Sequence, residues 1–571
     1  MRQSLWDMLA TGQPRRSLHT WADGGYVETP WHVVIARAHT AASVLSTLGV
    51  GPGVRVAGIL TNRTSSIVGL LGAWLTGAVV ASLPLPSRGA DPGEYPTQLA
   101  GITADLDARL LLLDDELRPL GLDRLATRVP LRSWDSLTGE SGRRTEPALP
   151  RPDDECFIQF SSGSTGRPKG CVLSARSVAR QIGMIRRMSA SGVGRERVAS
   201  WLPLSHDMGI FGCLLYSLAY DFEFFLSTPE RFTLSPRSWF RDLAEHRITL
   251  TAGTSTGLHL ATRAQGAGRL PRPLALRACV LGAERIDHEV LRGAVRTFGP
   301  DGLRMSHFMP AYGLAEATLA VTACPPSEPP KTMTLDAVRL ADGEVVVTAP
   351  GNDRATTVVS CGRPCEGVSV STTEPGRLSE IVVASPSLAE GYFADPVLTR
   401  ERFDGGRLLT GDLGFLADGE LYVVGRMDDL LSVGGRKVHA RELEAAVDAL
   451  GLLRQGCSVV LDLPGAPAEL VLLAELRRRT DDVQRTALEA ATAVRAKGGV
   501  VLARCFFVER NTLPRTPSGK IQRFRARWLL QRRRLAIVAT IDVNGNRAGK
   551  VSPILIPSTR SRKGAELDDV D

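Results

Sequence analysis

Short apolar runs alternate along most of this chain with stretches in which apolar residues recur every three or four positions. The runs at 53–61, 109–114 and 277–284 predict buried strands, and the spacing at 31–49 and 235–247 predicts amphipathic helices. Strands that alternate with helices in this way are typical of a large α/β domain whose sheets are mostly parallel.

The pattern changes in the second half of the chain. From about Val345 it consists of β-rich pieces with glycine turns, such as 419–426, which predict a β-subdomain. A shorter α/β pattern follows residues 427–431, so we expect a domain boundary near 426–430. The large domain is therefore predicted to span residues 1–426.

A smaller α/β domain is predicted over residues 427–535. Its helix is expected at 440–451, and its strands are expected at 457–463 and 468–476. Residues 536–571 are polar, contain Gly and Pro and carry charges of both signs, which predicts a loosely ordered tail.

One stretch, residues 67–86, carries no charge and nearly reaches the length of a membrane span. It contains three Gly and ends near two Pro, and its second half has the character of a strand. We therefore predict a buried helix followed by a buried strand, with no membrane span. The first twenty residues lack an apolar run, so no signal peptide is expected and a cytoplasmic location is predicted.

Charge and cysteine content narrow the possible functions. The net charge of +8 over 571 residues is modest, and much of the excess is Arg near the C-terminus, so the chain is not expected to bind nucleic acid. The nine Cys are scattered and form no C-x-x-C pair, which predicts free thiols without structural zinc.

The loop in "FIQFSSGSTGRPKGCVLS", residues 157–174, is rich in Gly, Ser and Thr. Glycines let a backbone approach a phosphate closely and donate from its N–H groups. The hydroxyls of Ser161, Ser162, Ser164 and Thr165 would add donors, and Lys169 would add a positive charge. The loop matches neither G-x-x-x-x-G-K-[ST] nor G-x-G-x-x-G, and a flexible surface loop is the ordinary alternative.

Three further motifs follow in order. They are "MPAYGLAEAT" at 309–318, "LLTGDLGFLADGELYVVGRMDD" at 408–429 and "LPRTPSGKIQR" at 513–523. Together with the loop they resemble the phosphate, adenine, ribose and catalytic-lysine motifs of the adenylate-forming superfamily, over roughly residues 20–530. Four motifs in the same order are far more specific than any one of them.

The resemblance implies ATP and Mg²⁺ as cofactors and assigns residues to them. Contacts with the ATP phosphates would come from Ser161, Ser162, Gly163, Ser164, Thr165, Gly166 and Lys169. Tyr312 would stack on adenine, Glu316 would hold Mg²⁺, and Asp412 with Arg426 would bind the ribose. Each also has an ordinary alternative, such as a core aromatic for Tyr312 or a turn cap for Asp412.

The same resemblance implies a two-step reaction. A carboxylate would attack ATP to give acyl-AMP and pyrophosphate, and a thiol would then accept the acyl group. Lys520 in "TPSGK" would stabilise charge in the first step, and Asp428 would be the hinge about which a mobile C-terminal domain rotates.

Within the superfamily the chain is most similar to the fatty acyl-AMP ligases. "WLPLSHDMGIFG" at 201–212 resembles their "HDMG" segment, and extra sequence at about 334–356 matches their insertion, which is thought to disfavour CoA. The "EVVV" core of this extra segment predicts a small β-element packed on the large domain. This resemblance places His206, Asp207 and Gly282 at the acyl substrate. It implies a fatty or related acid as substrate and a holo acyl carrier protein as acceptor.

Several alternatives stay open. "GGRKVHARELE" at 434–444 is closer to acyl-CoA synthetases, and Asp207 falls near the Asp that amino-acid-activating domains use. "GTSTG" at 253–257 matches the nucleophile elbow of serine hydrolases, which would require an exposed Ser255. A non-catalytic acyl- or nucleotide-binding protein is the last alternative, against which Lys520, Glu316 and Asp412 weigh.

Overall fold

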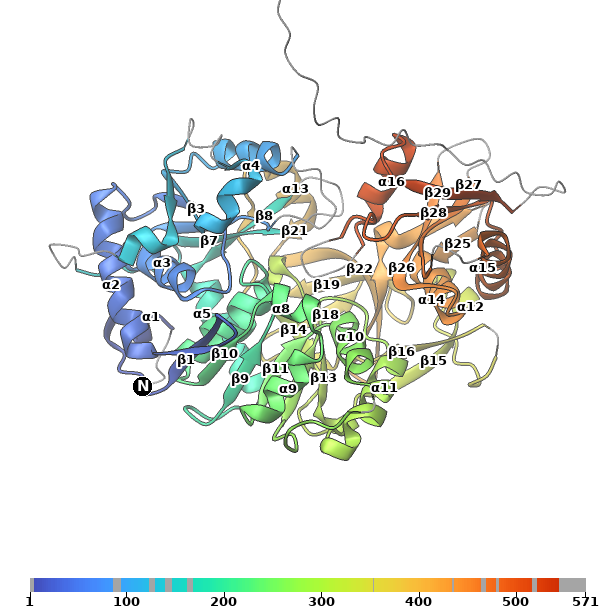
Figure 1. Cartoon of the computed structure of the whole chain (residues 1–571), viewed down its shortest axis with the longest axis horizontal. Coiled ribbons are helices and arrows are strands. Elements are labelled where there is room, and N and C mark those ends of the chain that lie inside the picture. The colour runs from blue at the N-terminus through green and yellow to red at the C-terminus, as the bar shows by residue number, and fades with distance from the viewer. Residues whose placement is uncertain are drawn as a thin grey trace, which may run out of the picture.

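The computed structural model describes residues 5–85, 94–122, 129–138, 146–161, 168–266, 268–352, 354–433, 436–463, 469–478, 482–515 and 521–543. Two large sheets form the bulk of the molecule, and a smaller α/β part follows them in the sequence (Figure 1). Most neighbouring strands in the two large sheets run parallel, which confirms the predicted α/β class.

The first large sheet has nine strands. Their order is β17 (Arg363–Pro364), β14 (Ala320–Ala323), β13 (Phe308–Gly313), β12 (Ala278–Leu281), β11 (Leu250–Gly253), β9 (Arg197–Ser200), β10 (Glu223–Leu226), β1 (Ser17–Ala22) and β2 (Gly25–Pro30). The second has seven strands, in the order β20 (Gly391–Tyr392), β8 (Lys169–Ser174), β7 (Glu155–Ser161), β4 (Val79–Ser82), β3 (Arg55–Gly58), β5 (Leu110–Leu113) and β6 (Leu131–Ser133).

Helices pack between and around these sheets. The main core joins both sheets through α1 (Leu5–Thr11), α2 (Trp31–Thr47), α3 (Thr64–Leu75), α5 (Ala175–Met188), the π-helix η4 (Ile210–Leu215) and α7 (Tyr216–Ala219). A second core covers the other face of the seven-stranded sheet beneath α4 (Glu94–Asp105). The nine-stranded sheet also carries α8 (Pro229–Leu234), α9 (Ser238–Glu245), α10 (Ser255–Gln265) and α11 (His288–Phe298).

The charge-free stretch forms α3 and β4, as the sequence predicted. Helix α3 is buried on every side, which explains its lack of charge. A Cβ at Gly69 would lie 2.2 Å from the ring of Trp134, and one at Gly72 would lie 2.8 Å from Ala41, so these glycines allow close packing. None of the helices in the described ranges has the length and apolar character needed to cross a bilayer.

A β-rich part follows the large sheets. Its five-stranded sheet contains β18 (Ser369–Thr372), β19 (Ser379–Ala384), β22 (Arg407–Ala417), β21 (Phe403–Asp404) and β23 (Glu420–Arg426), and α13 (Pro396–Arg402) lies beside it. The predicted extra segment lies before this sheet and consists of β15 (Thr332–Asp336), α12 (Ala337–Ala341) and β16 (Ala355–Val359). We call residues 332–359 the bridging segment.

The bridging segment differs from the expectation in one respect. The "EVVV" run at 344–347 was expected to be its β-core, but Glu344 and Val347 form only isolated bridges, with Arg377 and Leu335. Its regular strands are β15 and β16, which pair with each other. Val347 is 67% exposed, so this run has too little cover to form a strand of a packed sheet.

The C-terminal part begins after β23. The short helix η8 (Met427–Asp429) leads to β24 (Leu430–Val433) and β25 (Arg436–His439), and a four-stranded sheet follows. Its strands are β26 (Leu453–Leu463), β27 (Glu469–Leu476), β28 (Arg504–Val508) and β29 (Ile537–Asp542). Helices α14 (Ala440–Ala449) and α15 (Val483–Gly498) cover one face, and α16 (Arg523–Gln531) covers the other.

The prediction of a loosely ordered tail from residue 536 is wrong for residues 537–542. This segment is β29, which pairs antiparallel with β28 and buries Ala539 and Ile541 in the core of the C-terminal part. The later tail residues, 544–571, lie outside the described residues. All nine cysteines are buried with free thiols, as predicted.

Candidate active site

A cavity of about 1520 Å³ opens where the large sheets, the β-rich part and the C-terminal part meet. Residues of α4 and of α16 both line it, and Figure 1 shows these two helices on opposite sides of the upper surface. The cavity brings together most of the predicted site residues that the structure describes. These are Lys169, His206, Asp207, Gly282, Tyr312, Glu316, Asp412 and Arg426.

Tyr312, Asp412 and Arg426 form one cluster at this cavity. The Tyr312 hydroxyl donates to Oδ2 of Asp412 at 2.7 Å, and Nε of Arg426 lies 3.4 Å from Oδ1 of the same carboxylate. The strand register brings the last two together, since Asp412 on β22 lies opposite Arg426 on β23. Burial, and then the Asp412 charge, raise the pKa of Tyr312 well above its ordinary value, so its hydroxyl remains a donor.

Glu316 and Lys169 both lie close to Tyr392, a residue that the sequence did not single out. The hydroxyl of Tyr392 donates to Oε1 of Glu316 at 2.8 Å, and Nζ of Lys169 lies 5.7 Å from the centre of the Tyr392 ring. Strand β20 carries Tyr392 and pairs with β8, which begins at Lys169. Burial and the nearby Glu316 raise the pKa of Tyr392, which keeps its hydroxyl protonated and directed to this carboxylate.

His206, Asp207 and Gly282 lie where the cavity turns from polar to apolar. Nδ1 of His206 is 2.5 Å from Oδ1 of Asp207, and the same oxygen accepts from the backbone N–H of Met208 at 2.7 Å. A Cβ at Gly282 would lie 3.2 Å from the carbonyl oxygen of Ala311. A side chain at position 282 would therefore crowd this turn of the cavity.

Beyond Gly282 the cavity continues as an apolar arm. Helices α5 and η4 line one side of it, and strands β9, β11 and β12 line the other. Its apolar lining residues are Ile185, Met188, Val198, Cys213, Leu250, Ala252 and Val280. An apolar chain in this arm would be removed from water, and its burial would contribute roughly 25 cal/mol per Å².

Several predicted residues cannot be placed in this geometry. Ser162, Gly163, Ser164, Thr165, Gly166 and Lys520 lie outside the described residues, so their roles stay predictions. Ser161 ends strand β7 and Asp428 lies in η8, but the description does not extend to their side chains.

The C-terminal part also contributes to the cavity, through the last residues of the motifs at 408–429 and 513–523, to which no role was assigned. Asp429 and Arg523 both line it, and Nε of Arg523 lies 2.9 Å from Oδ1 of Asp429. Arg523 also pairs with Glu444 of α14. Asp429, next to the predicted hinge, is thus fastened to α16, and although both residues lie in the quoted motifs, nothing in the sequence indicates that they pair.

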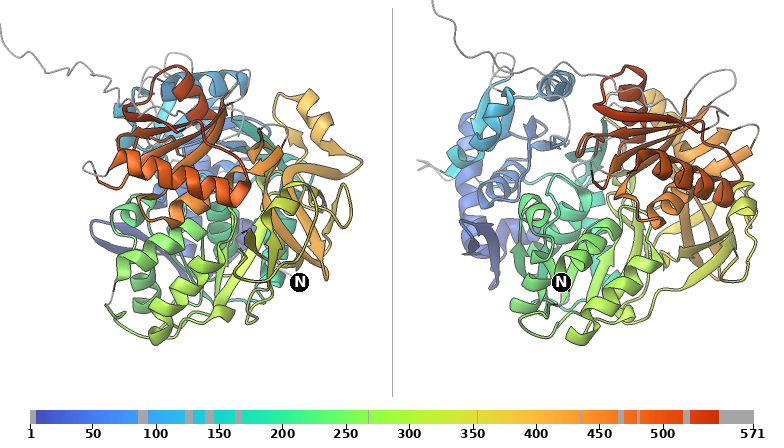
Figure 2. Two further views of the ribbon diagram at one scale, coloured as in Figure 1. Left: turned by 90° about the vertical axis from the view of Figure 1, so that its right-hand side faces the viewer. Right: turned by 45° about the vertical axis from the view of Figure 1, so that its right-hand side comes forward.

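Another unpredicted cluster joins three parts of the chain. Arg285, which follows β12, pairs with Glu442 of α14 and donates to Oγ1 of Thr356 and to the carbonyl of Thr357 in the bridging segment. Nζ of Lys497 in α15 lies 3.7 Å from Glu442 and donates to the carbonyl of Ala355. The bridging segment is therefore tied to the C-terminal part, and both views in Figure 2 show the two side by side.

These contacts control the charge of Glu442. Burial acts to raise the pKa of its carboxyl, but the positive charges of Arg285 and Lys497 outweigh burial and lower the pKa to about 2. Nearby His439 is buried, and neither ring nitrogen has a hydrogen-bond partner within the described ranges. Burial lowers the pKa of His439 to about 4.

Ser255 does not meet the requirement for a hydrolase nucleophile. It lies in a strand–turn–helix, as "GTSTG" predicted, but it is only 5% exposed. Its Oγ accepts a hydrogen bond from the backbone N–H of Asp287 at 3.2 Å. Thr254 caps the helix, so the Gly, Ser and Thr of this motif have a structural role.

Comparison with known proteins is consistent with this geometry. The family model of the AMP-binding enzymes matches residues 9–393. A putative acyl-CoA synthetase of Caulobacter vibrioides is 30% identical over 91% of this chain and 93% of its own length. The medium-chain-fatty-acid–[acyl-carrier-protein] ligase JamA of Moorena producens is 28% identical over 80% of this chain and 82% of its own length.

The chain is also similar to a solved structure over most of its length. It comes from a study of fatty acyl-adenylate ligases of E. coli and L. pneumophila and superposes with a TM-score of 0.84. The two chains are 25% identical, and the match covers 93% of this chain and 98% of that one. The likeness therefore extends over almost the whole of both chains.

Proposed function

Because this chain belongs to the AMP-binding enzyme family, we propose that it is an acyl-AMP ligase that activates a fatty or related carboxylic acid with ATP. The observation that carries this proposal is the composition of the large cavity. Its polar end contains Lys169, Tyr312, Glu316 and Asp412, and its arm between α5 and the nine-stranded sheet is apolar. A nucleotide and an acyl chain would thus meet near Gly282.

In the first step a carboxylate oxygen of the acid attacks the α-phosphorus of ATP. The bond from this phosphorus to the oxygen that bridges to the β-phosphate breaks, and pyrophosphate leaves with the electron pair. The product, acyl-AMP, is a mixed anhydride with a good leaving group. Lys520 would stabilise the charge that develops at the α-phosphate, and the remaining catalysis is positioning.

The described residues of the cavity would each bind a different part of the nucleotide. Asp412 would accept hydrogen bonds from the ribose hydroxyls, with Arg426 beside it, and Tyr312 would hold the adenine. Lys169 would neutralise phosphate charge at the entrance of the Gly-rich loop. The hydrogen bond from Tyr312 to Asp412 supports this division, because it fixes the ribose-binding group against the adenine-binding one.

Glu316 fits a magnesium ion. Mg²⁺ prefers carboxylate oxygen and is usually held by one or two carboxylates together with substrate phosphates. The Glu316 carboxylate lines the cavity and is oriented by the Tyr392 hydroxyl, which leaves it directed to the phosphate end. When bound, the ion would neutralise charge on the phosphates.

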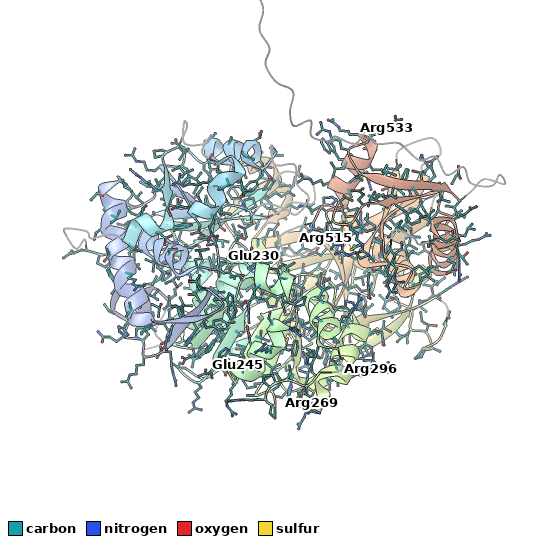
Figure 3. The ribbon with its side chains drawn as sticks, in the orientation of Figure 1. Glu230, Glu245, Arg269, Arg296, Arg515 and Arg533 are labelled. Atoms are coloured by element: carbon teal, nitrogen blue, oxygen red, sulfur yellow. The ribbon has the colours of Figure 1, made fainter. Side chains whose placement is uncertain are left out.

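In the second step we propose that the phosphopantetheine thiol of an acyl carrier protein attacks the acyl carbon, loses its proton and releases AMP. Two observations support a carrier protein over free CoA. The bridging segment, which matches the insertion thought to disfavour CoA, is held in place by Lys497 and Arg285. Arg532, Arg533 and Arg534 are exposed after α16, where an acidic carrier would dock, and Figure 3 shows Arg533 at this outer end.

An acyl-CoA synthetase is the second candidate. It is favoured by "GGRKVHARELE" at 434–444 and by the similarity to the putative acyl-CoA synthetase of Caulobacter vibrioides. The two candidates share the first step and differ only in the thiol acceptor. An amino-acid substrate has less support, since the Asp207 carboxylate already lies against His206 and the Met208 N–H.

The test is acid-dependent pyrophosphate release over a panel of fatty, aromatic and amino acids, followed by acceptor assays with CoA and with holo carrier proteins. We expect release with apolar acids and transfer to a carrier. Absence of release with every acid would overturn the proposal. Efficient acyl-CoA formation by the intact enzyme would assign it to the acyl-CoA synthetases instead.

A further inference from the structure

The two large sheets are joined by side chains at the carboxyl ends of their strands, the edge at which α/β sheets usually bind ligands. These side chains converge on residues 201–206, which follow β9 and lead into the short helix α6 (Asp207–Gly209). We call residues 201–206 the substrate turn, because it ends at His206, which lines the cavity together with Asp207. The position of this turn determines where the predicted acyl-substrate residues lie relative to the nucleotide end of the cavity.

Asn62 makes the first connection between the sheets. It lies beyond the end of β3 in the seven-stranded sheet and is 4% exposed. Its Nδ2 donates to the carbonyl of Leu202 at 3.0 Å and to that of Ser227 at 2.7 Å, and its Oδ1 accepts from the backbone N–H of Leu204 at 3.0 Å. One buried side chain thus satisfies three main-chain groups, two of which belong to the substrate turn.

Gln159 makes the second connection. It lies on β7, two residues before the strand ends at Ser161, where the Gly-rich loop begins, and it is 3% exposed. Its Nε2 donates to the carbonyl of Ser205 at 2.8 Å and to the carbonyl of Phe160 at 3.3 Å. The same amide group therefore connects the beginning of the Gly-rich loop to the substrate turn.

The oxygen of the Gln159 amide makes no such contact. Oε1 is buried, and no described residue donates a hydrogen bond to it. A buried acceptor without a donor costs stability, and an apolar side chain of the same size would avoid that cost. Stability alone therefore does not favour an amide at this position, which points to the contacts of the Gln159 N–H group as its role.

We propose that Gln159 and Asn62 are positioning residues for adenylation, which set the separation between the Gly-rich loop and the substrate turn. This inference rests on the proposed acyl-AMP ligase function. The loop would hold the phosphates that leave, and the turn would lie beside the attacking carboxylate, so an error in their separation would misplace the carboxylate oxygen relative to the α-phosphorus. A displacement of about 1 Å can lower such a rate by roughly 10²-fold. Neither residue lines the cavity, so both would act through the main chain.

The experiment separates the first step from binding of its product. Gln159→Met keeps the size of the side chain but removes the amide, and we expect it to lower kcat for acid-dependent pyrophosphate release by roughly 10- to 100-fold. The probe for product binding is a non-hydrolysable acyl-sulfamoyl adenosine. Its Kd should stay within about threefold of that of the intact enzyme, because this analogue of acyl-AMP lacks the β- and γ-phosphates that the loop would hold.

Asn62→Leu is the second variant and should show the same pattern, a lower kcat with retained affinity for the analogue. The two substitutions act on one turn, so the double variant should lose less than the product of the two single losses. Trp31→Phe is the matched control. Nε1 of Trp31 donates to the carbonyl of Phe222 at 2.8 Å, so this variant also removes a buried bond to a distant main-chain oxygen, but Trp31 does not line the cavity. It should lose stability and keep both kcat and analogue affinity.

The possible failures are distinguishable. An unchanged kcat in Gln159→Met would overturn this inference and leave the proposed function standing. Analogue affinity that falls by the same factor as kcat, or an equal loss of kcat in Trp31→Phe, would do the same, because either result would show a general structural role. If the intact enzyme releases no pyrophosphate with any acid, the proposed function falls and this inference falls with it.

Discussion

Tyr312 and Asp412 are joined by a hydrogen bond of 2.7 Å, although 100 residues separate them in the sequence. The bond connects β13 of the nine-stranded sheet to β22 of the β-rich part. Asp412 therefore enters the cavity in a fixed position, and a nucleotide would not have to order it on binding. This pre-arrangement is the basis of the first prediction.

Asp412→Asn is expected to lower kcat/KM for ATP by roughly 10- to 100-fold, because a charged acceptor for the ribose hydroxyls is lost. Tyr312→Phe should have a smaller effect, about three- to tenfold, since it removes only the bond that fixes Asp412. Pyrophosphate exchange into ATP at varied ATP concentration measures both. The control is Tyr422→Phe, in a ring that stacks on Phe415 and does not line the cavity; an equal loss there would contradict the assignment.

Lys520→Ala is expected to reduce adenylation by roughly 10²- to 10³-fold, the effect of removing one stabilising donor at a charged transition state. Transfer from acyl-AMP supplied from outside should be largely retained, since that step does not use this lysine. Single-turnover assays of the two half-reactions separate them. Normal pyrophosphate release by the variant would refute the role, which rests on the resemblance of "TPSGK" alone.

Lys497→Met should loosen the contact between the bridging segment and α15 without touching the cavity. If this contact disfavours CoA, acyl-CoA formation relative to carrier transfer should rise roughly tenfold, the effect of losing one charged hydrogen bond. Arg495→Met on the exposed side of the same helix is the control. If hydrogen exchange in α15 becomes faster but the acceptor preference does not change, the contact stabilises α15 and does not determine the acceptor.

His439 predicts a loss of stability on mild acidification. Its folded pKa of about 4 lies below the ordinary 6.5, so the unfolded state takes up a proton that the folded state refuses as pH falls. The free energy of unfolding should fall by up to about 3 kcal/mol, and this loss is complete near pH 4. The loss begins as the pH drops below 6.5, well above the pKa of about 2 at which Glu442 is protonated in the folded protein.

Hydrogen exchange of residues 438–450, corrected for intrinsic rates, measures this loss at several pH values. His439→Leu should flatten the dependence, since an apolar side chain replaces a ring whose nitrogens have no partner in the described part of the chain. His32→Gln, in an exposed histidine of α2, should leave it as in the intact protein. A slope that persists in His439→Leu would assign the effect to other groups.

The parts of the fold that were predicted from sequence are those that local pattern determines. The uncharged stretch became α3 and β4, because a helix that is buried on all sides must lack charge. The segment 537–542 was missed, because its strand exists only through pairing with β28, and strand formation depends on such neighbours more than on the residues themselves. The "EVVV" run at 344–347 is the opposite case. Its residues favour a strand, but they form only isolated bridges with the described residues around them.

The same distinction, between what local pattern determines and what distant contacts determine, holds for the residues of the candidate site. Lys169, Tyr312, Glu316 and Asp412 line the cavity, and they could be named in advance because each lies inside a motif whose order is itself informative. Their roles stay predictions. Tyr392 and Arg285 lie outside the four ordered motifs, Glu442 lies in the stretch 434–444 but was given no role, and each acts through a partner that is distant in the sequence. Contacts of this kind arise from the packing of whole elements, and a single sequence carries no mark of them.

Two of the bonds that tie the bridging segment in place end on main-chain oxygens, at Ala355 and Thr357. A carbonyl is the same whichever side chain stands beside it, so substitutions at these positions would leave the bonds intact. A deletion or insertion would instead shift the carbonyls away from Lys497 and Arg285. Substitutions at Ala355 and Thr357 can therefore accumulate without loss of these two bonds, which are altered chiefly by a change in the length of the segment.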